Sequence, residues 1–116
     1  SIGGTTRAPG TLAAHYAPRA RVVLVGRDSL AVSAGRALAA GEAVGVLGLG
    51  AETADAPDSC VTLATPATTA EYARALYAAL RRADEVGLDV VFVVPPPASG
   101  LGAAVVDRLK RAAASN

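Results

Sequence analysis

The sequence predicts an α/β fold, an open and mostly parallel sheet of about four to five strands flanked by helices. The clearest observation is the segment 89–94, in which five apolar side chains follow one another from Val90 to Val94 without alternation. Such a run is typical of a strand covered on both faces. Three prolines at 95–97 end this strand, because proline cannot donate to a sheet ladder. Strand-like segments also alternate with helix-like ones along most of the chain, which favours a parallel, Rossmann-like arrangement.

The segment before that strand predicts a helix over 68–86. Thr68 and Glu71 form a capping box, in which the hydroxyl and the carboxylate accept from amides that the first helical turn leaves unpaired. Gly87 is expected to end the helix as a left-handed residue. The apolar residues that recur at helical spacing are Tyr72, Leu76, Ala79, Leu80 and Ala83.

The remaining elements follow from apolar runs and turn residues. The other strands are expected near 21–26, 43–48 and 60–64. A helix near 29–40 is expected with Asp28 or Ser29 as its cap. The last helix, near 100–113, is expected to be capped by Ser99 and to pair Asp107 with Arg111. Its apolar stripe comprises Leu101, Val105, Leu109 and Ala112.

Composition limits the classes of function. Eleven basic and ten acidic side chains give a net charge of +1. This charge is too small to produce the strong positive field that non-specific phosphate binding needs. We therefore expect no direct nucleic-acid binding. The single Cys60 cannot form an internal disulfide, and no apolar run reaches the roughly 20 residues of a membrane span, so a cytoplasmic setting is expected. The chain begins with Ser1, which suggests a fragment of a longer protein.

Two glycine-containing segments are candidate ligand sites, each with a structural explanation. The segment 48–50 begins like a dinucleotide fingerprint but has Thr53 in place of the third glycine, so a tight turn at the end of a strand is favoured. Ser99, Gly100 and Gly102 lie where a strand end meets a helix start, and amides there can hold an anion or form a docking edge. A capped helix that packs closely is the favoured explanation.

The other polar candidates are weaker. The basic residues that could gather on the two last helices are Arg81, Arg82, Arg108, Lys110 and Arg111. Solvated outer helix faces explain them more simply than a binding patch. Cys60, in an apolar strand context, is expected to be buried rather than nucleophilic, and no metal site is predicted.

Residues 1–18 have no helical or alternating period and read as a linker, followed by a domain over 19–116. Within this linker, Pro9 and Gly10 precede the run His15, Tyr16, Ala17, Pro18. This pattern resembles the interdomain linker of the two-domain, YrdC-type threonylcarbamoyl-AMP synthases. The stretches LYAALRRADEVG and GLGAAVVDRLKRAA, on either side of the apolar strand, resemble the C-terminal domain of the same family.

The resemblance implies an L-threonylcarbamoyladenylate synthase that makes threonylcarbamoyl-AMP from threonine, bicarbonate and ATP, with magnesium, for the threonylcarbamoyladenosine modification at position 37 of tRNA. The motifs of the N-terminal YrdC-like catalytic domain are absent, so this chain is expected to be a non-catalytic accessory domain that needs no cofactor itself and docks on that domain. The family's linker, a strap across the catalytic mouth, would include Pro9, Gly10, His15, Tyr16 and Pro18. Its basic or aromatic positions are apolar at 12–14, which leaves nucleotide contact by the linker open.

Without a partner to lie on, the linker is expected to be mobile. Tyr16 and Pro18 should pack on the domain, and His15 should stay partly exposed. Two alternatives remain. One is an independent Rossmann-like domain that binds a nucleotide or small molecule at 48–50 or 99–102, and the other is an RNA-binding module.

Overall fold

The computed structural model describes residues 17–115 and contains one four-stranded sheet in which all pairs are parallel. The strands are β1 (Arg21–Leu24), β2 (Val44–Leu47), β3 (Val61–Ala64) and β4 (Val90–Val93). Their order across the sheet is β1-β4-β2-β3, so the last strand of the chain lies between the first and the second. The predicted open, parallel α/β sheet is confirmed.

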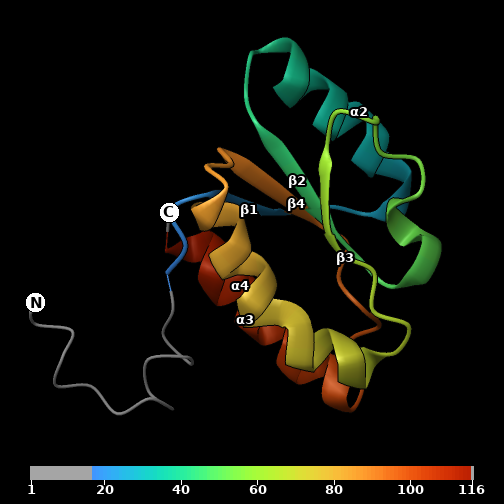
Figure 1. The fold of residues 1–116 in the computed structure, drawn as a ribbon. Coiled ribbons are helices and arrows are strands. Elements are labelled where there is room, and N and C mark those ends of the chain that lie inside the picture. The colour runs from blue at the N-terminus through green and yellow to red at the C-terminus, as the bar shows by residue number, and fades with distance from the viewer. Residues whose placement is uncertain (1–16, 116) are drawn as a thin grey trace, which may run out of the picture.

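Helices cover both faces of the sheet (Figure 1). They are α2 (Arg27–Ala39), α3 (Thr69–Glu85) and α4 (Leu101–Ala114), with a 3-10 turn η1 at Gly50–Thr53. Helices α3 and α4 pack together on one face, where their apolar stripes meet Val91 and Val93 of β4. Helix α2 packs on the other face against Val90 and Phe92.

Strand β4 forms the centre of the core. Its residues and the following Val94 are all buried, from 0% to 6% exposed, because each side chain of the unbroken apolar run meets helices on one face or the other. The unalternated sequence therefore marked the central strand correctly.

Helix α3 has the ends that the sequence predicts. The Thr68 hydroxyl accepts from the Glu71 amide at 3.1 Å, and the Glu71 carboxylate accepts from the amide of Ala67 at 2.9 Å. At the other end Gly87 has φ +77°, and its amide donates to the carbonyl of Asp84. The buried stripe is the predicted one, namely Tyr72, Leu76, Ala79, Leu80 and Ala83.

The starts of the other two helices differ from the prediction. Gly26, rather than Asp28 or Ser29, is the N-cap of α2, because β1 pairing continues to the Val25 amide and the chain turns directly into the helix. In α4 the N-cap is Gly100, with φ +55°, and no side chain caps it, so the predicted Ser99 cap is wrong.

Leu101 also departs from its predicted role. Its side chain is 49% exposed, and Gly102 takes its place in the buried stripe of α4 beside Val105, Leu109 and Ala112. The reason is the close approach of α4 to the preceding loop, which requires a residue without a side chain at the contact.

Candidate functional site

The chain enters the domain at the edge of the sheet where the strands begin, called here the N-terminal edge. Pro18 and Ala20 are buried, while Ala17 and Arg19 are exposed. The backbone amides of Arg19 and Ala20 both donate to the carboxylate of Asp84 in the last turn of α3, at 3.1 Å and 3.0 Å. The entry segment is therefore bound to a helix end that lies 64 and 65 residues further along the chain.

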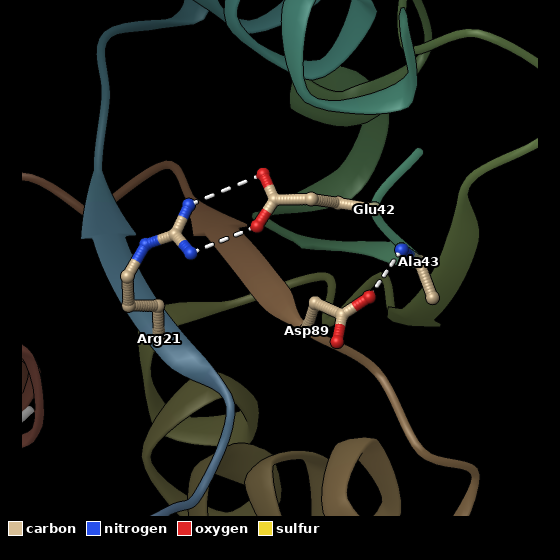
Figure 2. A network of polar contacts seen from close by, with 4 residues as sticks. All are labelled: Arg21, Glu42, Ala43 and Asp89. Atoms are coloured by element: carbon tan, nitrogen blue, oxygen red, sulfur yellow. Dashed lines mark hydrogen bonds and ion pairs between the residues drawn. The ribbon is translucent and has the colours of Figure 1, made fainter. Parts of the chain in front are cut away.

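Two further carboxylates bind at the same edge (Figure 2). Glu42 accepts two hydrogen bonds from the guanidinium of Arg21, at 2.8 Å and 3.3 Å. Asp89 accepts from the amide of Ala43 at 2.7 Å, just ahead of β2. The hydrogen bond to Glu42 raises the pKa of Arg21, so this cation keeps its charge.

These contacts hold the backbone in place and do not form a catalytic arrangement of side chains. The three acids are committed to N–H donors, and Arg21 with 52% of its side chain exposed faces solvent. Their arrangement suits the attachment of a preceding segment. Within residues 17–115, no group of three or more His, Cys, Asp or Glu side chains is placed to hold a metal ion.

The opposite edge, where the strands end, carries the predicted anion or docking residues. Ser99 and Gly100 are exposed and Gly102 is buried. The amide of Gly102 donates to the Ser99 carbonyl at 2.9 Å, and that of Ala103 donates to Gly100 at 3.1 Å. The closest approach is between Gly102 and the backbone carbonyl of Pro97, which a β-carbon at position 102 would overlap. Close packing therefore accounts for Gly102, and anion binding by this segment stays a prediction.

A cavity of about 370 Å³ lies beside β3, under the loop that joins β2 to β3. The residues that line it are Gly50, Ala51, Thr53, Ala54, Ala56, Pro57, Asp58, Cys60, Thr62 and Thr65. Three threonines and one aspartate are the polar residues of this lining, and no basic side chain is among these residues, which disfavours a phosphate ligand. Gly50 has φ +45° and opens η1, so the segment 48–50 forms the tight turn that the sequence favoured.

Cys60 lies at the cavity wall and is partly exposed rather than buried as expected. Partial burial raises the pKa of its thiol, which lowers the fraction of reactive thiolate at neutral pH. The prediction that Cys60 is not an activated nucleophile agrees with this shift.

A buried hydrogen bond that the sequence analysis missed also lies at this edge. The hydroxyl of Tyr72, in the first turn of α3, donates to the carbonyl of Val94 at 3.0 Å. Burial raises the pKa of this phenol. Tyr72 was recognised only as a member of an apolar stripe, since nothing local indicates a partner 22 residues away.

The linker predictions fall mostly outside residues 17–115. Pro9, Gly10, His15 and Tyr16 are not among the described residues, whereas Pro18 is buried on the domain as expected. The basic residues of the two last helices, Arg81, Arg82, Arg108, Lys110 and Arg111, are all exposed. Arg111 pairs with Asp107 at 3.1 Å, as predicted. No helix of the described chain has the length and apolar character to cross a membrane.

Residues 3–114 match the family model for the C-terminal domain of threonylcarbamoyl-AMP synthase. The chain belongs to this family. A curated relative, the threonylcarbamoyl-AMP synthase of Pyrococcus abyssi, is 37% identical over an alignment of 114 residues that covers 93% of this chain and 32% of the relative. This threonylcarbamoyl-AMP synthase C-terminal domain thus spans about a third of the length of the curated relative that it matches.

Solved structures are similar to the same domain. Pyrococcus abyssi Sua5 in complex with L-threonine is 36% identical, with a TM-score of 0.69 over 87% of this chain and 30% of that one. A variant of the same protein, with a consecutive histidine and tyrosine changed to alanine, is 31% identical, with a TM-score of 0.70 over 84% of this chain and 29% of that one. A C-terminal Sua5 domain from Pyrococcus horikoshii is 30% identical, with a TM-score of 0.58 over 81% of this chain and 93% of that one.

Proposed function

We propose that this chain is the accessory domain of a two-domain threonylcarbamoyl-AMP synthase and docks on an N-terminal YrdC-like catalytic domain. The catalytic domain would convert ATP, threonine and bicarbonate to threonylcarbamoyl-AMP and pyrophosphate, with magnesium, for the modification of tRNA at adenosine 37 in the cytoplasm. The accessory domain would not catalyse this reaction alone. It would hold the linker and set how that linker reaches the catalytic domain.

The observation that carries this proposal is the match of residues 3–114 to the C-terminal domain of the family, in a chain that covers 32% of its relative. The geometry supports it in a second way. At the N-terminal edge, Asp84 and Asp89 bind backbone amides and Glu42 binds Arg21. Such a surface suits attachment better than catalysis.

The linker motif adds support from a relative. A variant of Pyrococcus abyssi Sua5 was solved with a consecutive histidine and tyrosine replaced by alanine. This chain has the same dipeptide at His15 and Tyr16, immediately before the anchored segment. We propose that both residues belong to the strap between the domains.

The test compares three samples for pyrophosphate release from ATP that depends on threonine and bicarbonate. They are the full-length enzyme, the catalytic domain alone, and the catalytic domain with this chain added. We expect no turnover from this chain alone, and altered turnover when the domain is removed or added back. Turnover by purified residues 1–116 would overturn the proposal, as would a catalytic domain that behaves identically with and without this chain.

The cavity beside β3 favours one alternative, an independent domain that binds a small molecule. The three threonines and Asp58 in its lining would suit a neutral or cationic polar ligand rather than a nucleotide. Titration calorimetry of residues 19–116 with ATP, AMP and L-threonine separates the two proposals. Sub-millimolar binding by this fragment would favour the alternative, and the accessory role predicts no such binding.

A further inference from the structure

The carboxylate of Asp84 binds the backbone of the segment that joins the linker to β1. Asp84 accepts from the amide of Arg19 through both carboxylate oxygens, at 3.1 Å each, and from the amide of Ala20 at 3.0 Å. The Arg19 guanidinium adds a longer contact of 3.4 Å to the Asp84 carbonyl. Two consecutive backbone donors thus converge on one carboxylate, and this set of contacts is called here the Asp84 clamp.

Helix physics alone does not explain an aspartate at this position. Asp84 lies in the last turn of α3, where the helix dipole disfavours a negative charge. Charge-assisted hydrogen bonds from two amides offset that cost, and they are stronger than neutral ones. The clamp therefore accounts for a residue that the helix by itself would not favour.

The surroundings make the clamp directional. Beyond it the chain is fixed in the sheet, since the amide of Arg21 donates to the Asp89 carbonyl at 2.9 Å and its guanidinium binds Glu42. Before it Pro18 is buried and Ala17 is exposed. Within residues 17–115, the clamp thus fixes the backbone of the two residues that directly precede β1.

We propose that Asp84 is a positioning residue, which sets the direction in which the linker leaves the domain and hence the orientation of the catalytic domain. This inference rests on the proposed function for its consequence, while the clamp itself is testable in this chain alone. A fixed backbone at Arg19 and Ala20 limits the range of orientations that the two domains can adopt relative to each other. Loss of the clamp should widen this range without altering the sheet.

The first experiment measures amide hydrogen exchange in residues 1–116. In Asp84→Ala we expect exchange at Arg19 and Ala20 to be about tenfold faster, because the lost acceptor is charged. Glu85→Gln is the matched control, since it removes a neighbouring exposed carboxylate from the same last turn. Unchanged exchange at Arg19 and Ala20 in a folded Asp84→Ala protein would overturn the clamp.

A second variant approaches the contact from the other side and keeps α3 intact. Arg19→Pro removes an amide donor, whereas Arg19→Ala removes only the guanidinium and serves as its control. We expect Arg19→Pro to speed exchange at Ala20, and Arg19→Ala to leave it nearly unchanged. The double variant with Asp84→Ala should add little to either change, because both act through one contact. Full additivity would contradict the clamp.

The consequence is measured in the full-length enzyme by electron spin resonance distances. Cys60→Ser removes the free thiol of this chain, and Arg108→Cys then provides one labelling site at an exposed position. The second label is placed on the catalytic domain. Asp84→Ala and Arg19→Pro should broaden the distance distribution alike and change ATP turnover on the order of fivefold, with the two controls near wild type. An unchanged distribution would overturn the positioning role. Failure of the proposed function would be a separate result, namely ATP turnover that does not change when the whole C-terminal domain is removed.

Discussion

The two edges of the sheet are built from different interactions. At the N-terminal edge, where the chain enters, three carboxylates bind backbone amides or a guanidinium near solvent. At the C-terminal edge Gly102 packs against the Pro97 carbonyl and the buried Tyr72 hydroxyl donates to the Val94 carbonyl, while one exposed ion pair joins Arg27 to Glu52 at 3.5 Å. An exposed ion pair such as that of Arg21 with Glu42 is individually weak, the part-buried Asp84 clamp is stronger because its acceptor is charged, and buried packing tolerates almost no change. This difference suits an edge that receives a linker and an edge that holds the fold together.

Gly102→Ala should give the largest effect and tests the steric character of the C-terminal edge. A methyl group there overlaps the backbone carbonyl of Pro97, which cannot rotate away as a side chain would. We expect a loss of about 3 kcal/mol in the free energy of unfolding. The measurement is urea unfolding followed by circular dichroism.

Gly35→Ala is the control for that loss. Gly35 lies within α2, and a β-carbon there meets nothing within 4 Å. Because alanine favours a helix over glycine, this change should stabilise the domain by roughly 0.5–1 kcal/mol. Equal effects of the two substitutions would mean that the approach of α4 to the loop is not tight, and the comparison of the edges would fail.

Tyr72→Phe should have a middle-sized effect at the same edge. It removes the hydroxyl that donates to the Val94 carbonyl and leaves a buried acceptor without that donor. The expected cost is about 1–2 kcal/mol in unfolding free energy. Tyr77→Phe, at a partly exposed position of the same helix, is the control and should change stability by less than about 0.5 kcal/mol.

The same pair of variants gives a pH test. Burial raises the pKa of Tyr72 above that of the unfolded phenol, so its contribution is complete below the unfolded value and falls as the pH rises through about 10. Wild type and Tyr77→Phe should share this alkaline loss of stability, and Tyr72→Phe should show less of it. If Tyr72→Phe lost as much stability at alkaline pH as wild type, the loss would come from groups other than Tyr72.

Local signals explain why some elements were predictable. Helix α3 carries its capping box, its stripe and Gly87 within one stretch, and each behaves as predicted. The start of α2 was missed because the pairing of β1 with β4 extends to Val25, which overrides the better intrinsic caps at Asp28 and Ser29. A sequence pattern reports on neighbours along the chain, and that helix start is decided by a strand almost 70 positions away.

The candidate site was less predictable for the same reason. The Asp84 clamp joins residues 65 positions apart, and nothing in the pattern of α3 separates Asp84 from any other solvated acid. The sequence indicates that Gly102 suits close packing, but it does not indicate that the contact is with Pro97 rather than with the sheet. The linker motif was accessible only through resemblance to a family, since residues such as His15 form no periodic pattern.

The smallest expected effect is at the N-terminal edge, in the pair between Arg21 and Glu42. The two side chains are 52% and 26% exposed, so solvent screens their attraction despite the 2.8 Å contact. Arg21→Gln should cost less than about 1 kcal/mol, and a double-mutant cycle with Glu42→Gln should isolate the pair. Because the raised pKa of Arg21 keeps it charged, the coupling should not vary with pH near neutrality but should shrink between low salt and 1 M salt.

The matched control for that pair is Arg111→Gln, which breaks the more exposed contact with Asp107 on α4. It should give an even smaller coupling with the same dependence on salt, since neither pair is buried. A coupling between Arg21 and Glu42 that is large and insensitive to salt would show that this edge is as rigid as the other. The N-terminal edge would then contribute to the stability of the fold, and its role in receiving the linker would rest on the Asp84 clamp alone.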